Sequence, residues 1–481
     1  MRIRRVLSLV GLVVFFMGIA MLISMLVALI FRDGSALAIL ASALIAMALG
    51  ALLFVQDKSR KRSDFSLKDG YGIVGFSWIA ACLVGALPFL LSGSIPDVEM
   101  AIFESTSGLT TTGSTILDDI EALPKSILFW RSFLHWLGGM GIIVLSVAIL
   151  PYLGLGGMQL YRAESPGPTK DKLKPRIQQT AELLWKVYLV ISLLCFLLLW
   201  AAGMDWFEAI NHTFSTVATG GFSIYNDSIG HFRAPLIQYI IIFFMAFCAV
   251  SFALHFRAMT GDPKAYLRTE ELRLFLSIIL LATLFIYLSR RDEGLPPEQN
   301  LRESLFQVVS IITSTGYGTA DFELWTPFAQ VTLLFLMVTG GCAGSTAGGF
   351  KVVRILLLGK YLKTSLNQQL HPSGVFVIKL DGARVKRDVL HNILGFFMVA
   401  ILLIAVTTYA LCLFDVDLVT AATAALSSVS NIGPALGDVG PSESFSSIPS
   451  EGLWLLSLCM IMGRLEVFSL LILFLPQTWQ Q

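Results

Sequence analysis

Long apolar runs separated by short polar segments dominate the pattern of this chain. A helix needs about 20 predominantly apolar residues to span a bilayer. We predict ten spans, one of them in two pieces: Val6–Phe31, Ala36–Val55, Tyr71–Leu91, Ile127–Leu150, Leu183–Ala202, Leu236–Leu254, Leu272–Leu288, Phe328–Met337 with Val352–Leu358, Val389–Phe414 and Leu453–Leu475. The first run exceeds the apolar region of a signal peptide, about 7–15 residues, so we expect a retained transmembrane helix.

Four half-apolar stretches too short to cross lie between paired runs, and each is rich in Thr, Ser or Gly. Each can be written as eleven residues ending in glycine: Phe103–Gly113, Ile210–Gly220, Phe306–Gly316 and Thr423–Gly433. Such internal repetition indicates a repeated structural unit. We therefore predict two extra transmembrane helices in residues 1–68, followed by repeats at 69–175, 176–265, 266–375 and 376–481.

Re-entrant stretches of this kind imply a pore. Non-helical backbone at membrane depth must be buried in protein or line a water-filled path. Glycine lets successive carbonyls point toward one axis, and a ring of carbonyls can replace the hydration shell of a cation. Without carboxylates, such a ring suits a weakly hydrated monovalent cation, whereas Mg²⁺ or Ca²⁺ would want carboxylates.

A single stretch would favour plain helix packing through small residues, but four in one register favour the pore. The third continues as Ser314-Thr315-Gly316-Tyr317-Gly318, close to the T-V-G-Y-G pattern of potassium channels. The predicted fold is thus an all-α polytopic membrane protein, with four pseudo-symmetric helix–pore loop–helix repeats around one pore.

The eighth span breaks at Gly340–Phe350, where five of eleven residues are glycine. The segment is either a kinked, closely packed helix or an unwound loop that blocks the pore, and we favour the loop. Arg464 lies inside the last span, and an ionisable group there indicates function by default. We expect it to face the cavity or to bond the carbonyls of Gly340–Gly349, rather than to reach for the membrane surface.

Composition and charge agree with a membrane protein. Hydrophobic residues make up 55% of the chain and charged residues 14%, against about 25% charged in soluble domains. This excludes soluble, secreted, disordered and nucleic-acid-binding classes. The six cysteines lie in apolar or glycine-rich segments without a CxxC motif, so they indicate neither disulfides nor a metal site.

The distribution of charge predicts orientation. With the N-terminus in the cytoplasm, 26 of 34 basic residues fall on the cytoplasmic side, as the positive-inside rule requires. The pair Arg290-Arg291 is an exception. By the same assignment 21 of 33 acidic residues are extracellular. They are either ordinary solvated loops or a field that concentrates cations.

Motifs for catalysis are weak. The chain has no G-x-x-x-x-G-K-[ST] sequence, so we expect no ATP hydrolysis and no nucleotide bound by this chain. Ser345 and Asp438 lack evident partners for hydrolysis, and filter-like loops argue against a mere scaffold. Of the two transport mechanisms, we favour a gated channel-like pathway. A proton- or sodium-coupled symporter usually has inverted repeats and a mid-membrane ionisable site.

The sequence resembles the membrane subunits of Trk-type potassium uptake systems (TrkH/TrkG) in the Trk/Ktr/HKT superfamily. The resemblance covers nearly the whole chain and is carried by Thr110–Ser114 and Asn431–Pro434. It implies a pore in one polypeptide, a homodimer in the bacterial inner membrane with both termini cytoplasmic, and K⁺ as the transported ion. It also implies a cytosolic TrkA-like regulatory subunit that binds NAD(H) or ATP/ADP.

The same resemblance assigns filter and gate residues. The potassium-binding carbonyls would come from Thr111, Thr112, Gly113, Ala218, Thr219, Gly220, Ser314, Thr315, Gly316, Asn431, Ile432 and Gly433. Glycine at all four final positions favours potassium over sodium, although the fourth loop departs from the Thr-Gly pattern. The gate would comprise Gly340, Gly341, Gly344, Ser345, Gly348, Gly349, Lys351 and Arg464, with Arg464 as an electrostatic barrier.

Overall fold

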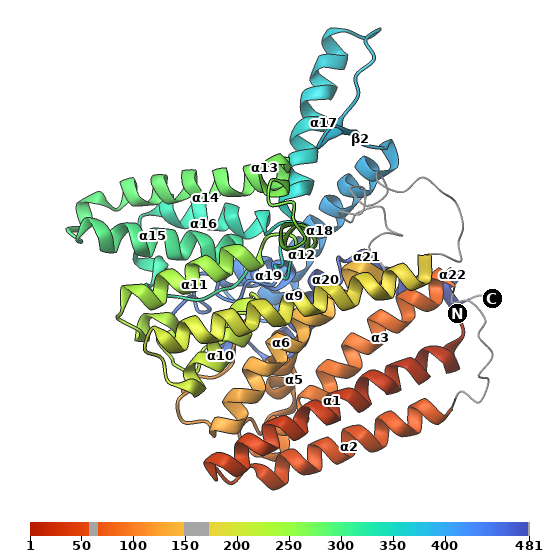
Figure 1. Cartoon of the computed structure of the whole chain (residues 1–481), viewed down its shortest axis with the longest axis vertical. Coiled ribbons are helices and arrows are strands. Elements are labelled where there is room, and N and C mark those ends of the chain that lie inside the picture. Colours follow the sequence, from red (N-terminus) through yellow and green to blue (C-terminus); the bar gives the residue numbers. More distant parts are fainter. Residues whose placement is uncertain (57–65, 149–172, 480–481) are drawn as a thin grey trace.

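The computed structural model describes residues 1–56, 66–148 and 173–479, and this part of the chain is almost wholly helical (Figure 1). A short antiparallel hairpin joins β1 (Lys379–Leu380) to β2 (Ala383–Arg384). The basic residues predicted to be cytoplasmic in segments 57–65 and 149–172 lie outside the described residues.

Two helices precede the repeated part of the chain. α1 (Ile3–Phe31) and α2 (Ala36–Val55) lie side by side at one edge of the molecule (Figure 1). Their backbones meet at glycines, because a Cβ atom added at Gly11 would lie 2.6 Å from the carbonyl oxygen of Gly50. Small residues allow such close approach of helices in membranes. The expected pair of N-terminal helices is therefore present.

The remaining chain repeats one order four times: a long helix, a short helix and a second long helix, often broken. The four sets are α3 (Leu67–Gly85) with α4 (Leu87–Leu91), α5 (Val98–Leu109) and α6 (Lys125–Ala148); α9 (Leu173–Ala201), α10 (Trp206–Val217) and α11 (Pro235–Cys248) with α12 (Phe252–Met259); α14 (Glu270–Ser289), α15 (Pro297–Ile312) and α16 (Pro327–Thr339) with α17 (Val352–Leu370); and α18 (Arg387–Leu413), α19 (Leu418–Ser430) and α20 (Ser450–Arg464) with α21 (Phe468–Phe474). Shorter pieces are α13 (Ala265–Arg268), α22 (Pro476–Trp479) and the turns η2 (Ser228–His231), η3 (Arg291–Glu293), η4 (Phe322–Leu324) and η5 (Phe445–Ser447).

The short helices α5, α10, α15 and α19 contain 12 to 16 residues. At 1.5 Å per residue they cannot cross a hydrocarbon core about 30 Å thick. Acidic residues precede them, and Asp205 and Asp417 accept hydrogen bonds from the first backbone amides of α10 and α19. Acids are favourable at the positive end of a helix dipole. The carboxyl ends of the four helices lead into the Thr/Ser/Gly stretches.

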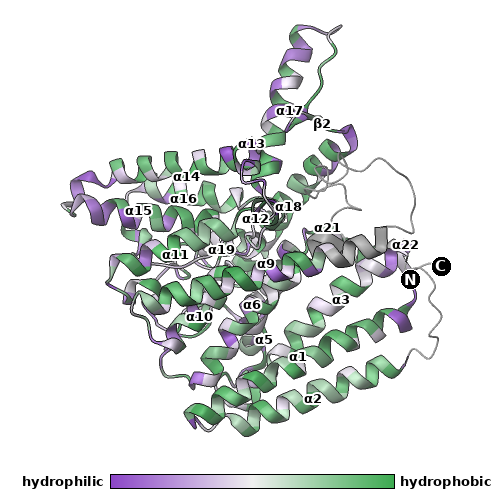
Figure 2. Ribbon diagram, in the orientation of Figure 1, coloured by the Kyte–Doolittle hydropathy of each residue, from purple (hydrophilic) through white to green (hydrophobic). Residues whose placement is uncertain are grey.

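Six described helices are long and apolar enough to cross a membrane, or eight if each of two bent pairs is one span. The other predicted spans correspond to α6 and to the interrupted pair α16–α17. Figure 2 shows apolar residues along the long helices and hydrophilic residues at helix ends and on α17. Exposed apolar side chains such as Met398 and Phe335 are expected on a surface that faces lipid.

Two spans predicted as continuous are bent. The axes of α11 and α12 differ by 97°, and those of α20 and α21 by 117°. At the first bend, Ala249 accepts a hydrogen bond from Cys342 N at 2.9 Å, and Phe252 N donates to the Gly344 carbonyl at 3.0 Å. The backbone groups freed by the bend are thus satisfied by the glycine-rich segment of the third repeat.

The exceptional outer arginine pair has a local explanation. Arg290 is buried and forms ion pairs of 2.8 Å with Glu293 and 3.0 Å with Glu303. Its guanidinium lies 4.1 Å from the ring centre of Trp325. These partners neutralise the charge of Arg290, which lessens the conflict of this residue with the predicted orientation.

Candidate ion-conduction site

The four short helices end in the same backbone turn. Four residues adopt a left-handed conformation with φ of 53–54°: Thr111, Thr219, Ser314 and Asn431. In every case this residue donates its amide to the carbonyl three residues earlier, and the next residue donates to the carbonyl five residues earlier. Left-handed backbone costs energy for residues other than glycine and gathers at functional sites. The repeated Thr/Ser/Gly sequence therefore corresponds to a repeated backbone geometry.

Two residues after each of these positions stands a glycine with positive φ. The four glycines are Gly113, Gly221, Gly316 and Gly433, with φ between 79° and 108°. This places the second loop one residue later than the eleven-residue alignment predicted. In this turn Gly221 is equivalent to Gly113, and Gly220 is equivalent to Thr112. The shared geometry therefore selects Thr219, Gly220 and Gly221, one position later than the predicted Ala218, Thr219 and Gly220.

The sequence register and the backbone register differ because the second loop has two consecutive glycines. Either could end an eleven-residue register in a sequence, and only the backbone angles distinguish them. The fourth loop, in contrast, keeps the common turn despite its Asn-Ile-Gly sequence. Asparagine tolerates the left-handed region better than most residues. The side-chain amide Nδ2 of Asn431 also donates to Thr112 Oγ1 and to the Met460 carbonyl, both at 2.9 Å.

The four loops contact one another in a closed cycle, which we call the four-loop ring (residues 111–113, 219–221, 314–316 and 431–433). A Cβ atom added to each positive-φ glycine would meet the carbonyl oxygen of the middle residue in the next loop. The pairs are Gly113 with Gly220 at 2.2 Å, Gly221 with Thr315 at 1.9 Å, Gly316 with Ile432 at 2.0 Å and Gly433 with Thr112 at 2.9 Å. The ring thus brings together four equivalent carbonyls and leaves no space for side chains at its glycines.

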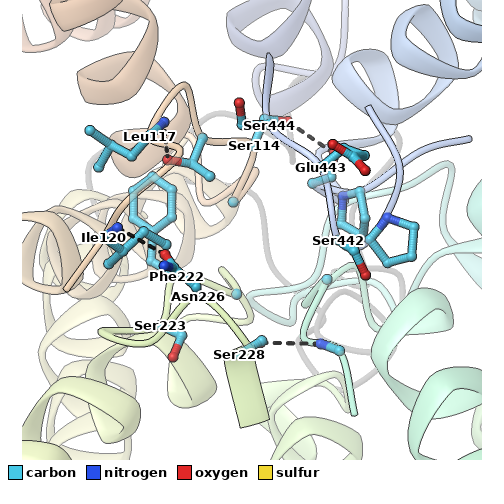
Figure 3. Close-up of a pocket in the computed structure, with 18 of the residues that line it drawn as sticks. Ser114, Leu117, Ile120, Phe222, Ser223, Asn226, Ser228, Ser442, Glu443 and Ser444 are labelled. Atoms are coloured by element: carbon cyan, nitrogen blue, oxygen red, sulfur yellow. Dashed lines mark hydrogen bonds between the residues drawn. The ribbon is translucent and has the colours of Figure 1, made fainter. Parts of the chain in front are cut away.

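A polar cavity of about 380 Å³ lies against the ring and is lined by segments from all four repeats. Its lining includes the four ring glycines, together with Asp118 and Glu443. In Figure 3, Ser442 and Glu443 lie across the cavity from Phe222 and Asn226. The two carboxylates belong to the acidic outer loops that the sequence placed outside the membrane.

A buried ion pair joins the first two loops behind the ring. Arg131 Nε of α6 lies 2.7 Å from Glu104 Oε1 of α5, and both side chains are buried. Glu104 also accepts from Ile116 N at 3.0 Å, and Arg131 donates to the Ser223 carbonyl at 3.2 Å. Both residues were predicted as outer loop charges, and this buried pair was not predicted. The available signal was an arginine inside an apolar run.

The glycine-rich break Gly340–Phe350, the gate segment, lies against the carboxyl ends of three short helices. Gly349 N donates to the Ser430 carbonyl at 2.8 Å, and Thr346 Oγ1 donates to the Val217 carbonyl at 3.1 Å. Gly348 N donates to Ser314 Oγ. The backbone is strained or glycine-dependent here, with positive φ at Gly340, Gly344 and Gly349.

Arg464 bonds the gate segment. Its Nη1 donates to the Thr346 carbonyl at 2.8 Å, and its side chain is buried, which agrees with the expected bond to the carbonyls of Gly340–Gly349. Within the described residues, Nε and Nη2 have no hydrogen-bond partner. Glu466 pairs instead with Arg354, and Lys351 Nζ donates to the Ala347 carbonyl.

Glu271, in the first turn of α14, also contacts the gate segment, and this contact was not predicted from the sequence. Its Oε1 accepts from Ala343 N of the gate segment at 2.7 Å. The neighbouring Glu270 pairs with Lys360 of α17 and accepts from Asp381 N at 3.1 Å. The start of α14 therefore holds both the gate segment and the hairpin that follows α17.

These features define a class: a multi-pass membrane protein in which loops after four short helices meet in a ring beside an interrupted helix. Comparison with known proteins gives the family. The TrkH family model, described as a cation transport protein, matches residues 35–480, and the chain belongs to this family.

Relatives cover the full chain. It is 42% identical to the Trk system potassium uptake protein TrkH of Escherichia coli (strain K12), covering 100% of both chains. It is 33% identical to TrkG of the same strain, covering 99% of both. The crystal structure of the potassium transporter TrkH from Vibrio parahaemolyticus matches with a TM-score of 0.92 at 39% identity, covering 100% of both chains.

Proposed function

We propose that this protein takes up potassium across a bacterial inner membrane through the four-loop ring, by a gated, channel-like pathway. The observation that carries the proposal is the closed cycle of carbonyls, each contributed by the same position of one loop. Relatives named as potassium uptake proteins over the full chain support the choice of ion.

The chemistry of the ring favours potassium. Its twelve residues provide backbone carbonyls and hydroxyls but no carboxylate: Thr111, Thr112, Gly113, Thr219, Gly220, Gly221, Ser314, Thr315, Gly316, Asn431, Ile432 and Gly433. Carbonyls replace the hydration shell of a weakly hydrated monovalent cation. The four short helices add partial negative charge at their carboxyl ends.

The gate segment closes this pathway in the proposal. It lies against the carboxyl ends of the short helices, and Arg464 places a positive charge on the Thr346 carbonyl. A buried arginine in an ion path repels cations. Deleting residues 344–347 should therefore raise basal rubidium flux. Unchanged flux in a folded deletion variant would contradict this role.

Assembly and regulation complete the proposal. We infer a homodimer with a cytosolic TrkA-like subunit that binds NAD(H) or ATP/ADP, and basic residues of α17 and its hairpin offer that subunit a docking surface. The N-terminus lies beside α22 (Figure 1), with the Met1 ammonium 3.4 Å from the Thr478 carbonyl. This proximity supports an arrangement with both termini in the cytoplasm.

Rubidium uptake into proteoliposomes tests the function. We expect saturable uptake, driven by a potassium-diffusion potential, that sodium does not replace. The flux should need no proton gradient or sodium gradient. Uptake that requires either gradient would support the symporter instead, and equal sodium uptake would overturn the selectivity.

A further inference from the structure

The second loop of the ring lacks a side chain that the other three loops have. Its middle residue is Gly220, where the others carry Thr112, Thr315 and Ile432, all fully buried. Thr112 Oγ1 accepts from Asn431 Nδ2 at 2.9 Å, and Thr315 Oγ1 lies 2.7 Å from Thr313 Oγ1. Each of these three side chains is therefore enclosed in protein, and the second loop has no counterpart to them.

Backbone conformation does not require a glycine at position 220. Its φ lies outside the left-handed region, whereas φ of Gly221 is +87°. The imidazole of His135 on α6 excludes a side chain there. A Cβ atom added at Gly220 would lie 2.4 Å from Nδ1, 2.5 Å from Cγ and 2.7 Å from Cε1 of that ring. Gly220 is thus a glycine because a neighbouring helix occupies its side-chain space.

The ring of His135 is held on two further sides. Its Nδ1 lies 3.2 Å from Ser215 Oγ of α10. It stacks on Phe222, which directly follows the loop, with ring centres 4.2 Å apart and planes inclined by 19°. The same Phe222 ring is contacted by the Arg131 guanidinium, which lies 4.2 Å from the ring centre. The imidazole therefore contacts the short helix, the loop and the segment after it.

We propose that His135 is a positioning residue of the filter, whose ring supplies from α6 the wall that the second loop lacks. In this role it fixes the Gly220 carbonyl, which lies beside Gly113, and so keeps four carbonyls at one spacing. The inference rests on the proposed potassium pathway. It adds a selectivity determinant outside the four loops.

The test is a mutant cycle read by rubidium and sodium uptake. His135→Ala should lower the rubidium-to-sodium ratio about tenfold, because the second loop loses its support. Gly220→Thr should abolish selective uptake, because the hydroxyl and methyl groups meet the imidazole. The double variant should recover most of the ratio, since the threonine fills the vacated space as Thr112 and Thr315 do in their loops. Ser132→Ala, also buried on α6 but bonded only to its own helix, is the control.

A conservative variant and a second readout keep the test decisive. His135→Phe keeps the ring volume and should stay within about threefold of the wild-type ratio. A folded His135→Ala protein with wild-type selectivity, or a double variant no better than the worse single variant, would overturn the proposal. Unfolding midpoints of the wild-type protein, His135→Ala, Gly220→Thr and the double variant report the packing independently of ion uptake. If the wild-type protein takes up no rubidium but the midpoints show rescue, the pathway fails while the wall role of His135 stands.

Discussion

At the scale of single residues, glycine serves two distinct purposes in the ring: four glycines adopt a positive φ, and Gly220 leaves space for His135. Gly113, Gly221, Gly316 and Gly433 combine a positive φ with a carbonyl oxygen where a Cβ would be. The left-handed residues before them cost about 1–3 kcal/mol each when they are not glycine. That cost is tolerated because the surrounding hydrogen bonds, repeated in four loops, determine the turn.

Replacing Gly221 by alanine should abolish selective rubidium uptake. The added methyl would lie 1.9 Å from the Thr315 carbonyl oxygen, so the second and third loops would have to separate. Gly203→Ala is the matched control, because its φ is +112° but no atom lies within 4 Å of an added Cβ. We expect it to lose only about 1 kcal/mol of stability and to keep its selectivity. Equal behaviour of the two variants would show that backbone strain alone, and not the carbonyl contact, matters.

The buried pair of Glu104 and Arg131 should behave as a unit. Removing one partner leaves an unpaired buried charge and costs about 3–5 kcal/mol, whereas replacing both by apolar residues is often tolerated. We expect Arg131→Met to lower the unfolding midpoint strongly and Glu104→Leu/Arg131→Met to restore part of it. Thermal unfolding in detergent measures both, and additive losses would argue against coupling.

The sequence predicted the existence of the ring but not its wall. Thr, Ser and Gly in four similar stretches indicated the turn and its glycines. The contact between Gly220 and His135 was not predicted, because a glycine that leaves space for a neighbouring ring has the same sequence signature as a glycine required by φ. Contacts between residues that are distant in sequence decide that difference.

At the scale of elements, three of the four second spans break near the gate segment. The breaks follow Cys248, Thr339 and Arg464, and hydrogen bonds connect them through Ala249, Gly344 and Thr346. Only the middle break is rich in glycine, so only that one was predicted. The backbone at the break after Cys248 is bonded by the third repeat, whereas the amides of residues 465–467 donate to carbonyls of α20 itself. Hydropathy along one helix reveals neither arrangement.

Arg464 should control basal flux through this cluster of breaks. Arg464→Met keeps an unbranched apolar stem but removes the guanidinium, with its charge and its bond to the Thr346 carbonyl. We expect rubidium uptake without a regulatory subunit to rise severalfold. Arg302→Met, at an arginine of α15 that pairs with Glu298, should leave uptake unchanged. Lower uptake in a folded Arg464→Met protein would assign Arg464 to holding the pathway open.

At the scale of the whole molecule, the ring lies between an acidic cavity and a segment contacted by basic side chains. Asp118 and Glu443 line the cavity, while Arg464 and Lys351 bond the gate segment. The sequence left open whether the outer acids are ordinary solvated loops or a field for cations. The third charged residue of the lining, Arg131, is paired with Glu104. The two acids, which have no ion pair within the described residues, therefore favour the field, since a cleft of net negative charge raises the local concentration of cations.

Glu443→Gln should therefore raise the rubidium concentration needed for half-maximal uptake by a few-fold at low ionic strength. Screening shortens the reach of a charge from about 30 Å at 0.01 M salt to about 3 Å at 1 M, so the difference should vanish as an impermeant salt is added. Glu451→Gln, an exposed acid in the first turn of α20 that does not line the cavity, is the matched control. A difference that persists at high salt would mean that Glu443 contacts the ion directly. Equal shifts in the two variants would show that the outer acids are ordinary solvated loop residues.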